Sequence, residues 1–261
     1  MSKEIPQYVA GHNLLADKTV LITAAAGAGI GFAAAKRAAE EGAKALFIAD
    51  IHEGRLNKSA DKIEEETGLR PHIQLCNVTD ENDVQALVDA AVEKMGHIDV
   101  LINNAGLGGS KRLVDMEDAE WSRVIDVTLT GTMRMTRAAL KHMQPRGKGV
   151  IVNNASVCGW RAQVEQAHYA AAKAGVMALT RCSALEAADF GVRINAVSPS
   201  IAVHDFLKKS ASEELLADLV KDEAFGRGAE VWEVANVMMF LASDYSSYMT
   251  GEVVSCSSQR S

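Results

Sequence analysis

The sequence predicts an α/β fold in which a parallel sheet carries helices on both faces. Short runs of branched apolar residues alternate with helical segments along the whole chain of 261 residues. Strands that alternate with helices form parallel sheets, because each return connection crosses the sheet as a helix. The runs are apolar without polar alternation, which is typical of strands buried on both faces. We find no internal linker, low-complexity tract or short repeat, and we expect one domain over residues 1–261.

The first half of the chain alternates strands and helices after a polar arm over residues 1–16, which we expect to lie on the surface. The expected strands are Thr19–Thr23, Ala45–Ala49, His72–Cys76 and Asp99–Ile102. The expected helices cover residues 32–41, 53–67 and 81–95. Gly68 and Pro71 mark the end of the second helix.

The second half begins with one long helix, about Glu117 to Met143, whose apolar residues at helical spacing are more typical of a core than of a cofactor site. It continues with a strand at Val150–Val152, a helix at 167–188, a strand at Val192–Val197, a helix at 230–242 and a strand near Glu252–Ser255. The segment 201–228, bracketed by Pro199 and Gly226, is the expected substrate lid.

Composition excludes several classes of function. Asp and Glu exceed Lys and Arg, giving a net charge of −7, so a nucleic-acid-binding surface has no support. No apolar run approaches about 18 residues and the N-terminus has no apolar signal core, so we expect a cytoplasmic protein without a membrane partner. The four cysteines form no C-x-x-C pair, which predicts reduced thiols and no metal site. Cys158 fits a small apolar filler better than a nucleophile.

Glycines cluster between the first expected strand and the first helix, in the run A-A-A-G-A-G-I-G. Gly27, Gly29 and Gly31, with Ile30 between the last two, lead directly into the helix. Glycines let the backbone bend and approach a ligand closely, and a helix N-terminus offers unpaired N–H groups to anions. The order of strand, glycine turn and helix therefore predicts a loop that binds the pyrophosphate of a dinucleotide.

Asp50 ends the second expected strand, nineteen residues after Gly31. A carboxylate at this spacing can accept hydrogen bonds from both ribose hydroxyls of an adenosine and repels a 2′-phosphate. The position therefore favours NAD over NADP as cofactor. The alternative is that Asp50 only caps the helix that begins near Glu53.

Three side chains around the fifth expected strand predict the chemistry. Ser156 lies just past the strand's end, where open α/β sheets place their ligand crevices. Tyr169 opens an Ala-rich helical segment, and Lys173 follows one turn later on the same face. A hydroxyl can hold a substrate oxygen, a phenol can pass a proton, and an ammonium beside the phenol lowers its pKa. The alternative is a packed tyrosine and a solvated lysine, which leaves the position of Ser156 unexplained.

Together these residues resemble the short-chain dehydrogenase/reductase family over about residues 14–255. The shared pattern comprises Thr23 with the loop glycines, Asn103–Gly106, Ser156, Tyr169-x-x-x-Lys173, Arg193–Pro199 and Met249–Glu252. The resemblance implies a Rossmann-type, doubly wound parallel sheet of seven strands and NAD(P)-dependent interconversion of a secondary alcohol and a ketone. It also implies a homotetramer or dimer, often built on the helices that here contain Trp121 and Tyr169.

The same resemblance assigns roles to individual residues. It makes Tyr169 the acid/base, Ser156 the residue that positions the substrate oxygen, and Lys173 the residue that binds the nicotinamide ribose. The expected cofactor contacts are Thr23, Gly27, Gly29, Ile30, Gly31, Asp50, Asn77, Val78, Asn104, Ala105, Gly106, Tyr169, Lys173, Pro199 and Ser200.

Four positions depart from the family pattern. The first loop glycine is Ala24, and the glycine after Pro199 is Ser200. The Asp that contacts the adenine amine is Asn77, whose amide can still accept one hydrogen bond. The fourth catalytic residue, an Asn in the long helix, is Thr128. Its hydroxyl could hold a water for the lysine or bond the carbonyl of its own turn.

The residues between Ser156 and Tyr169 are expected at the mouth of the substrate pocket. The expected substrate contacts are Trp160, Arg161, Gln163, His168 and, from the lid, Phe206. Aromatic groups suit a bulky apolar ring, while Arg161 or the pair Lys208-Lys209 suits a carboxylate or the phosphates of a thioester. For the lysine pair, a solvated lid face is the favoured interpretation. The central stretch is also similar to a bacterial subgroup that acts on hydroxylated coenzyme A thioesters in steroid ring C/D breakdown.

Two other classes fit parts of the sequence. Hydro-lyases and epimerases of the same superfamily usually have longer chains with a separate C-terminal substrate domain. A catalytically silent NAD-binding scaffold or redox sensor is consistent with Thr128 and with Ser255-Cys256-Ser257-Ser258, which replaces the D-G-G typical of the family near the C-terminus. NAD binding without hydride transfer to any alcohol or ketone would favour the scaffold.

Overall fold

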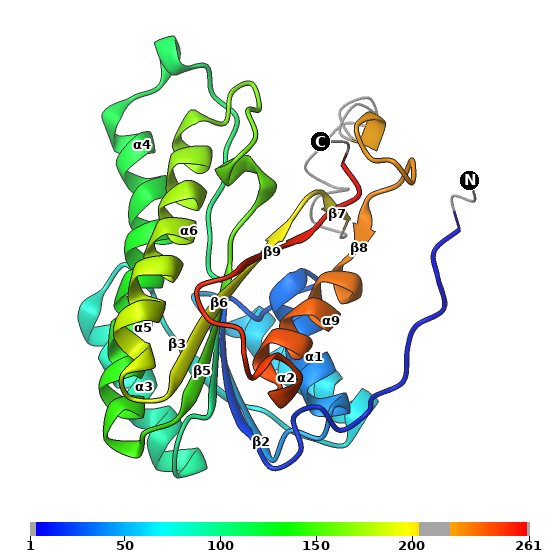
Figure 1. Ribbon diagram of the computed structural model, residues 1–261, viewed down its shortest axis with the longest axis vertical. Helices are drawn as coiled ribbons and strands as arrows, with labels where there is room; N and C mark the ends of the chain where they lie inside the picture. Colours follow the sequence, from blue (N-terminus) through cyan, green and yellow to red (C-terminus); the bar gives the residue numbers. More distant parts are fainter. Residues whose placement is uncertain (1–3, 204–219, 260–261) are drawn as a thin grey trace.

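Seven parallel strands form the main sheet of the computed structural model, which describes residues 4–203 and 220–259 (Figure 1). The strands are β1 (Thr19–Thr23), β2 (Ala45–Asp50), β3 (His72–Leu75), β4 (Val100–Asn103), β5 (Gly149–Asn154), β6 (Val192–Pro199) and β9 (Val253–Cys256). Their order is β3-β2-β1-β4-β5-β6-β9, so the chain starts in the middle and winds outward in both directions. The predicted doubly wound Rossmann-type sheet is confirmed.

Helices cover both faces of this sheet (Figure 1). One layer contains α1 (Ile30–Glu40), α2 (Glu53–Thr67) and α9 (Val231–Ala242). The other contains α3 (Glu81–Met95), α4 (Asp118–Ile125), α5 (Gly131–Met143) and α6 (Ala167–Ala188). None of the described helices is both long and apolar enough to cross a membrane.

Two hydrophobic cores lie between the sheet and its helix layers. Val20 and Ile22 belong to the core under α1 and α9, whereas Leu21 between them belongs to the opposite core. Successive side chains of a strand point to opposite faces. Because both faces are covered, each strand needs apolar residues at every position, which explains the continuous apolar runs in the sequence.

A second, two-stranded parallel sheet joins the ends of the expected lid. It pairs β7 (Ala202–Val203) with β8 (Ala229–Glu230). The two ends of the segment 201–228 therefore lie side by side, beyond the carboxyl end of β6 (Figure 1). Phe206, which was expected to contact substrate, and the pair Lys208-Lys209 lie outside the described residues.

The long helix expected over residues 117–143 is present as a continuous helical run over 118–143, with a π-helical segment inside it. A π-helical segment, Asp126–Thr130, separates α4 from α5. Gly131 starts α5 against Val78, where an added Cβ would stand 2.7 Å from Val78 Cγ2. The apolar residues keep helical spacing on both sides of the π-helical segment. The sequence pattern therefore gave no sign of this wider turn.

The N-terminal arm lies over α1 and α9, as expected. The Glu41 carboxylate accepts hydrogen bonds from the backbone of His12 at 2.7 Å and of Leu14 at 3.0 Å. The Tyr8 ring meets the Trp232 ring edge to face, with the centroids 5.3 Å apart. The arm is therefore held by both aromatic and polar contacts.

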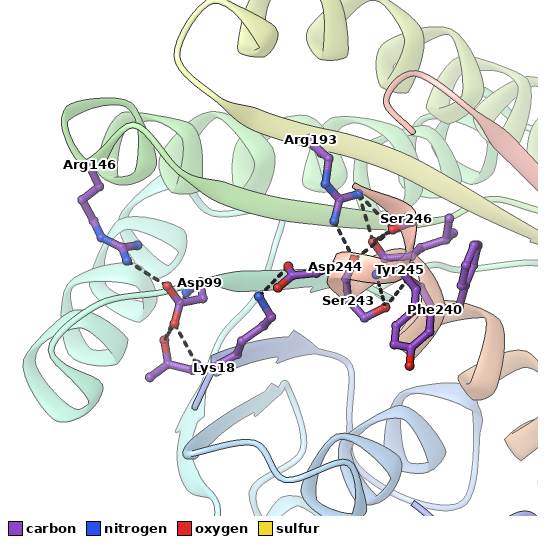
Figure 2. A network of polar contacts seen from close by, with 11 residues as sticks. Lys18, Asp99, Arg146, Arg193, Phe240, Ser243, Asp244, Tyr245 and Ser246 are labelled. Atoms are coloured by element: carbon purple, nitrogen blue, oxygen red, sulfur yellow. Dashed lines mark hydrogen bonds and ion pairs between the residues drawn. The ribbon is translucent and has the colours of Figure 1, made fainter. Parts of the chain in front are cut away.

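Ion pairs and hydrogen bonds close the amino-terminal edge of the sheet (Figure 2). Lys18, just before β1, pairs with Asp244 at 2.9 Å, and Asp99, just before β4, pairs with Arg146 at 2.8 Å. Arg193 of β6 donates to the Ser243 carbonyl at 2.9 Å. These contacts hold the strand starts together. The opposite, carboxyl edge is where the predicted site residues lie.

Candidate active site

Two glycines of the loop between β1 and α1 have different structural reasons, close packing at Gly31 and a positive φ at Gly27. A Cβ on Gly31 would stand 2.2 Å from the Ala24 carbonyl oxygen. Gly27 has a φ of +96°, in the region that favours glycine. Ala24 replaces the expected first glycine and has a φ of +51°, which costs a residue with a Cβ conformational energy. Asn104 donates to the Ala24 carbonyl at 2.9 Å and helps to hold this conformation.

A cavity of about 370 Å³ opens at the carboxyl ends of β1 to β4. Its walls are mainly apolar, with few polar groups, as in sites for flat heteroaromatic ligands. Several expected cofactor contacts line it together: Thr23, Asp50, Asn77, Val78, Ala105 and Gly106. Its other lining residues are Ala24, Ala49, Ile51, Cys76, Leu107, Arg123 and Val127. The cavity and the adjoining glycine loop fit the adenosine end and the pyrophosphate of a dinucleotide.

Asp50 faces this cavity and does not cap α2. Its carboxylate accepts hydrogen bonds from the backbone of Ala26 at 3.2 Å and of His52 at 3.1 Å. His52 is the N-cap of α2 and no side chain caps that helix, so the capping alternative is wrong. Burial raises the pKa of Asp50, while the Ala26 hydrogen bond and the charge of Arg55 oppose the rise. The carboxylate therefore ties the glycine loop to β2 at the cavity wall.

Asn77 lines the cavity but does not offer it the expected acceptor. Its side-chain oxygen accepts hydrogen bonds from the backbone N–H of Thr79 at 3.1 Å and from the Thr79 hydroxyl at 2.9 Å. These bonds form a local turn that fixes the orientation of the amide. The prediction that Asn77 accepts from the adenine amine is therefore wrong, because its oxygen is engaged within the turn.

A chain of hydrogen bonds joins β1 to the catalytic helix. The Thr23 hydroxyl accepts from the backbone of Asn104 at 3.1 Å and of Ala105 at 3.2 Å. The Asn104 side-chain oxygen accepts from the Asn154 amide at 2.9 Å. The Asn154 carbonyl in turn accepts from Lys173 Nζ at 2.5 Å. The position of the lysine is thereby set from the strand that carries the glycine loop.

Ser156, Tyr169 and Lys173 converge, as the sequence predicted. Ser156 lies near enough to Tyr169 to lower its pKa, and Lys173 Nζ lies 5.6 Å from the centroid of the Tyr169 ring. Ser156 and Lys173 are buried, and Tyr169 is half-buried. Gly106 of the cavity wall lies against the lysine, since an added Cβ would stand 3.4 Å from its Nζ. Lys173 therefore lies directly behind the cavity wall at Gly106, with Tyr169 beside it.

Burial controls the acid–base character of this group. It raises the pKa of Tyr169 to about 12, with a further rise from Cys158 and an opposing effect of the Ser156 hydrogen bond. Burial also lowers the pKa of Lys173 to about 8, which Cys158 partly offsets. Burial therefore sets the pKa of Tyr169 here, and the expected lowering of that pKa by Lys173 stays a prediction. Desolvation favours the neutral form of both groups.

The Thr128 hydroxyl bonds the backbone of Leu107 and not the carbonyl of its own turn. Its hydroxyl accepts from the backbone N–H of Leu107 at 2.9 Å and donates to the Leu107 carbonyl at 3.1 Å. The side chain is fully buried in the π-helical segment. We therefore regard Thr128 as a positioning residue for the loop that follows β4, in place of the catalytic role expected from the resemblance.

That loop packs on the catalytic helix through its glycines. An added Cβ on Gly108 would stand 3.7 Å from the Tyr169 ring, and one on Gly109 would stand 3.2 Å from His168 Nε2. Gln166 donates to the Gly109 carbonyl at 2.6 Å. His168 is fully buried under this loop, so its predicted place at the pocket mouth is wrong. The loop shields it from any substrate.

The remaining substrate predictions differ in their surroundings. Trp160 is 45% exposed and available for contact. Gln163 is exposed, and its oxygen accepts from Cys158 Sγ at 3.2 Å. Arg161 donates to the Gln259 side chain at 2.8 Å and is thus tied to the C-terminal segment.

Pro199 and Ser200 lie at the end of β6, away from the larger cavity. Pro199 pairs in register with Cys256 of β9. Ser200 lines a smaller cavity of about 140 Å³ with Glu223, Arg227 and Cys256, among others. Their expected cofactor contacts remain predictions.

Sequence reasoning missed several residues that shape the site. Asn154 joins the two halves of the hydrogen-bond chain, and Arg123 and Val127 form the α4 side of the cavity. The repeated Asn-Asn pair at residues 103–104 and 153–154 could have drawn attention to Asn154. No comparable signal marked Arg123, because its role depends on how α4 packs beyond the sheet edge.

The fold and the site together define a class of protein. None of the three converging side chains is redox-active, and the cavity beside them suits a dinucleotide. That class is the nicotinamide-dependent oxidoreductases. A family model described as enoyl-(acyl carrier protein) reductase matches residues 24–258. The chain belongs to the short-chain dehydrogenase/reductase family.

Known relatives are similar along the whole chain. The (5R,7aS)-5-hydroxy-7a-methyl-1-oxo-2,3,5,6,7,7a-hexahydro-1H-indene-carboxyl-CoA reductase of Mycobacterium tuberculosis is 60% identical over 97% of each chain. The crystal structure of a short chain dehydrogenase from Mycobacterium smegmatis is 57% identical over 99% of each chain, with a TM-score of 0.88. A variant of actinorhodin polyketide ketoreductase, solved with NADPH, is 30% identical over 93% of this chain and 96% of its own, with a TM-score of 0.87.

These relatives establish the protein as an oxidoreductase that acts on CH–OH groups and uses a nicotinamide cofactor. They do not support the silent scaffold. No relative named above is a hydro-lyase or an epimerase.

Thr128→Val should loosen the loop after β4 while keeping the volume of the side chain. It leaves the N–H and carbonyl of Leu107 without their partner, and we expect the free energy of unfolding to fall by about 1–3 kcal/mol. Thr128→Ser retains the hydroxyl and should lose less than about 1 kcal/mol. Urea unfolding of both variants measures the difference. Equal losses would show that the two hydrogen bonds are not the important contribution of Thr128.

Ketone reduction should be fastest below the pKa of Lys173, about 8, and should slow as the pH rises through it. Lys173 loses its positive charge in that range, while Tyr169, with a pKa of about 12, keeps the proton it donates. Profiles of kcat/KM against pH measure this. Cys158→Ser removes a group that raises the pKa of Lys173, so the fall should move to lower pH. A flat profile, or a move to higher pH, contradicts the assignment.

Proposed function

We propose that this enzyme interconverts a secondary alcohol and a ketone on a bulky apolar ring system carried as a coenzyme A thioester, with NAD(H) as cofactor. The convergence of Ser156, Tyr169 and Lys173 at the edge of the dinucleotide cavity carries this proposal. A bound nicotinamide dinucleotide supplies or accepts the hydride.

Each of the three residues has a defined part in the reaction. In the reduction direction, the Tyr169 phenol donates its proton to the carbonyl oxygen, and in oxidation the tyrosinate removes the hydroxyl proton. The Ser156 hydroxyl donates a hydrogen bond to the same oxygen and stabilises the charge that develops on it. The Lys173 ammonium, anchored on the Asn154 carbonyl, contacts the nicotinamide ribose and stabilises tyrosinate when it forms.

The substrate class is supported by similarity and by the mouth of the site. The Mycobacterium tuberculosis relative is named for a methyl-substituted indene carried as a coenzyme A thioester, and a fused six-five ring with an angular methyl is the form of steroid rings C and D. The exposed Trp160 offers an aromatic face to such a ring. We therefore propose a steroid-derived hydroxyacyl-CoA or its ketone as substrate, with Trp160, Gln163 and Phe206 among its contacts.

We also propose NAD in preference to NADP, a homodimer or homotetramer, and a cytoplasmic location. The carboxylate of Asp50 on the cavity wall would repel a 2′-phosphate. Exposed apolar side chains on the α4 and α6 side, including Trp121 and Leu185, support association of subunits there. The four cysteines are free, which is consistent with a reducing compartment.

Tyr169→Phe should lower kcat for alcohol oxidation and ketone reduction by about 100-fold or more, because it removes the proton that is transferred. The affinity for NAD should stay within a fewfold of wild type. Absorbance of the reduced nicotinamide with cyclic ketones and acyl-CoA thioesters measures the first, and calorimetric titration the second. Tyr245→Phe, on an exposed ring, is the matched control and should have no effect. Full turnover by Tyr169→Phe would refute the assigned acid/base.

The wild-type enzyme should prefer NAD(H), and Asp50→Ser should lower the ratio of NAD to NADP affinity by about tenfold or more. The substitution removes a negative charge that would face the 2′-phosphate, and like charges in contact disfavour a complex by several kcal/mol. Titration with both cofactors measures the ratio. Asp115→Ser, an exposed aspartate outside the cavity, is the control. Tighter binding of NADPH than NADH by the wild type would overturn this preference.

A further inference from the structure

Arg123 is a charged residue that lines the dinucleotide cavity, and its guanidinium has no partner in the described part of the protein. It lines the cavity together with Val127, one helical turn further along. Trp121, two residues before it, lies on a different side of the helix. Within residues 4–203 and 220–259, the Arg123 side chain makes no hydrogen bond or ion pair. The guanidinium is therefore available to bind a ligand in a cavity that is large enough for an aromatic ring.

The rest of this cavity lacks an anionic acceptor on the Asn77 side. Asn77 has its oxygen engaged by Thr79 and leaves only its NH₂ group free. Burial raises the pKa of the Cys76 thiol to about 12, so that thiol is neutral. Arg123 and Asp50 are the only charged residues among those that line the cavity in the described part of the chain. Among the described residues that line the cavity, Arg123 is therefore the only cation that can contact a nucleotide base.

We propose that Arg123 binds the adenine base of the dinucleotide. A guanidinium is planar and weakly hydrated, so it stacks on aromatic faces and donates to ring nitrogens. Adenine offers both a π-face and acceptor nitrogens, N3 and N7. The family pattern has an Asp at the position of Asn77, whose carboxylate accepts a hydrogen bond from the adenine amine. In this protein the Asn77 NH₂ group and the Arg123 guanidinium offer hydrogen-bond donors instead. This inference rests on the proposed function of the cavity as the NAD site.

The alternative ligand for an arginine in such a cavity is the 2′-phosphate of NADP. Asp50 lines the same cavity, and its carboxylate opposes a phosphate on the adenosine ribose. The adenine base is uncharged, so Asp50 does not oppose its contact with Arg123. The two ligands predict different effects on cofactor preference, which allows them to be separated by binding measurements.

Arg123→Met tests the proposal by calorimetric titration with NAD, ADP-ribose and nicotinamide mononucleotide. We expect the affinities for NAD and for ADP-ribose to fall together by about fivefold, the size of a single cation–π contact. The affinity for nicotinamide mononucleotide, which has no adenine, should not change. Arg112→Met, an exposed arginine outside the cavity, is the control and should bind all three ligands as wild type does. Circular dichroism and the Tm confirm that both variants are folded.

Two results would overturn the proposal. Binding of NAD and ADP-ribose by Arg123→Met within twofold of wild type would show that the guanidinium does not contact adenine. A larger loss of affinity for NADP than for NAD would assign Arg123 to the 2′-phosphate instead. A wild-type protein that binds neither NAD nor ADP-ribose would contradict the proposed function itself, and would thus be distinguished from failure of this inference alone.

Discussion

Two asparagine pairs at the carboxyl ends of β4 and β5 hold the site together. Asn103 and Asn153 are register partners, and the Asn103 amide donates to the Asn153 oxygen at 2.9 Å. Asn104 and Asn154 repeat the contact one residue further along, also at 2.9 Å. A buried amide without its partner costs about 1–3 kcal/mol, so any shift of β5 against β4 is penalised at both pairs. The strand register and the site geometry therefore depend on the same four side chains.

The same buried arrangement determines the protonation states of Lys173 and Tyr169. Asn154 holds Lys173 by its carbonyl, and burial around the lysine and Tyr169 favours the neutral form of each. A charge on Lys173 is thus poorly compensated by the protein alone. The acid–base behaviour of the pair consequently depends on what binds next to it. That dependence couples proton transfer to occupancy of the neighbouring cavity.

The features that the sequence predicted correctly depend on local spacing. Apolar runs identified the strands, and the positions of Ser156, Tyr169 and Lys173 after a strand and on one helix face brought them together. Two of the incorrect predictions depend on contacts between residues that are not neighbours in the sequence. Thr128 bonds Leu107, 21 residues away, and His168 is covered by Gly109. Neither contact has a periodicity or motif, because the path of the loop after β4 decides both.

Three of the four single-residue departures from the family pattern lie around the adenosine cavity, and the fourth, Ser200, lies at the end of β6. Ala24 and Asn77 line the adenosine cavity, and Thr128 holds Leu107, which lines it too. The group around the reacting atoms keeps Ser156, Tyr169 and Lys173. Changes in the wall of a binding cavity alter affinity, whereas changes at the reacting end remove a step of the chemistry. Ala24 and Asn77 therefore alter how this enzyme holds the dinucleotide, whereas Thr128 stands where the family has its fourth catalytic residue.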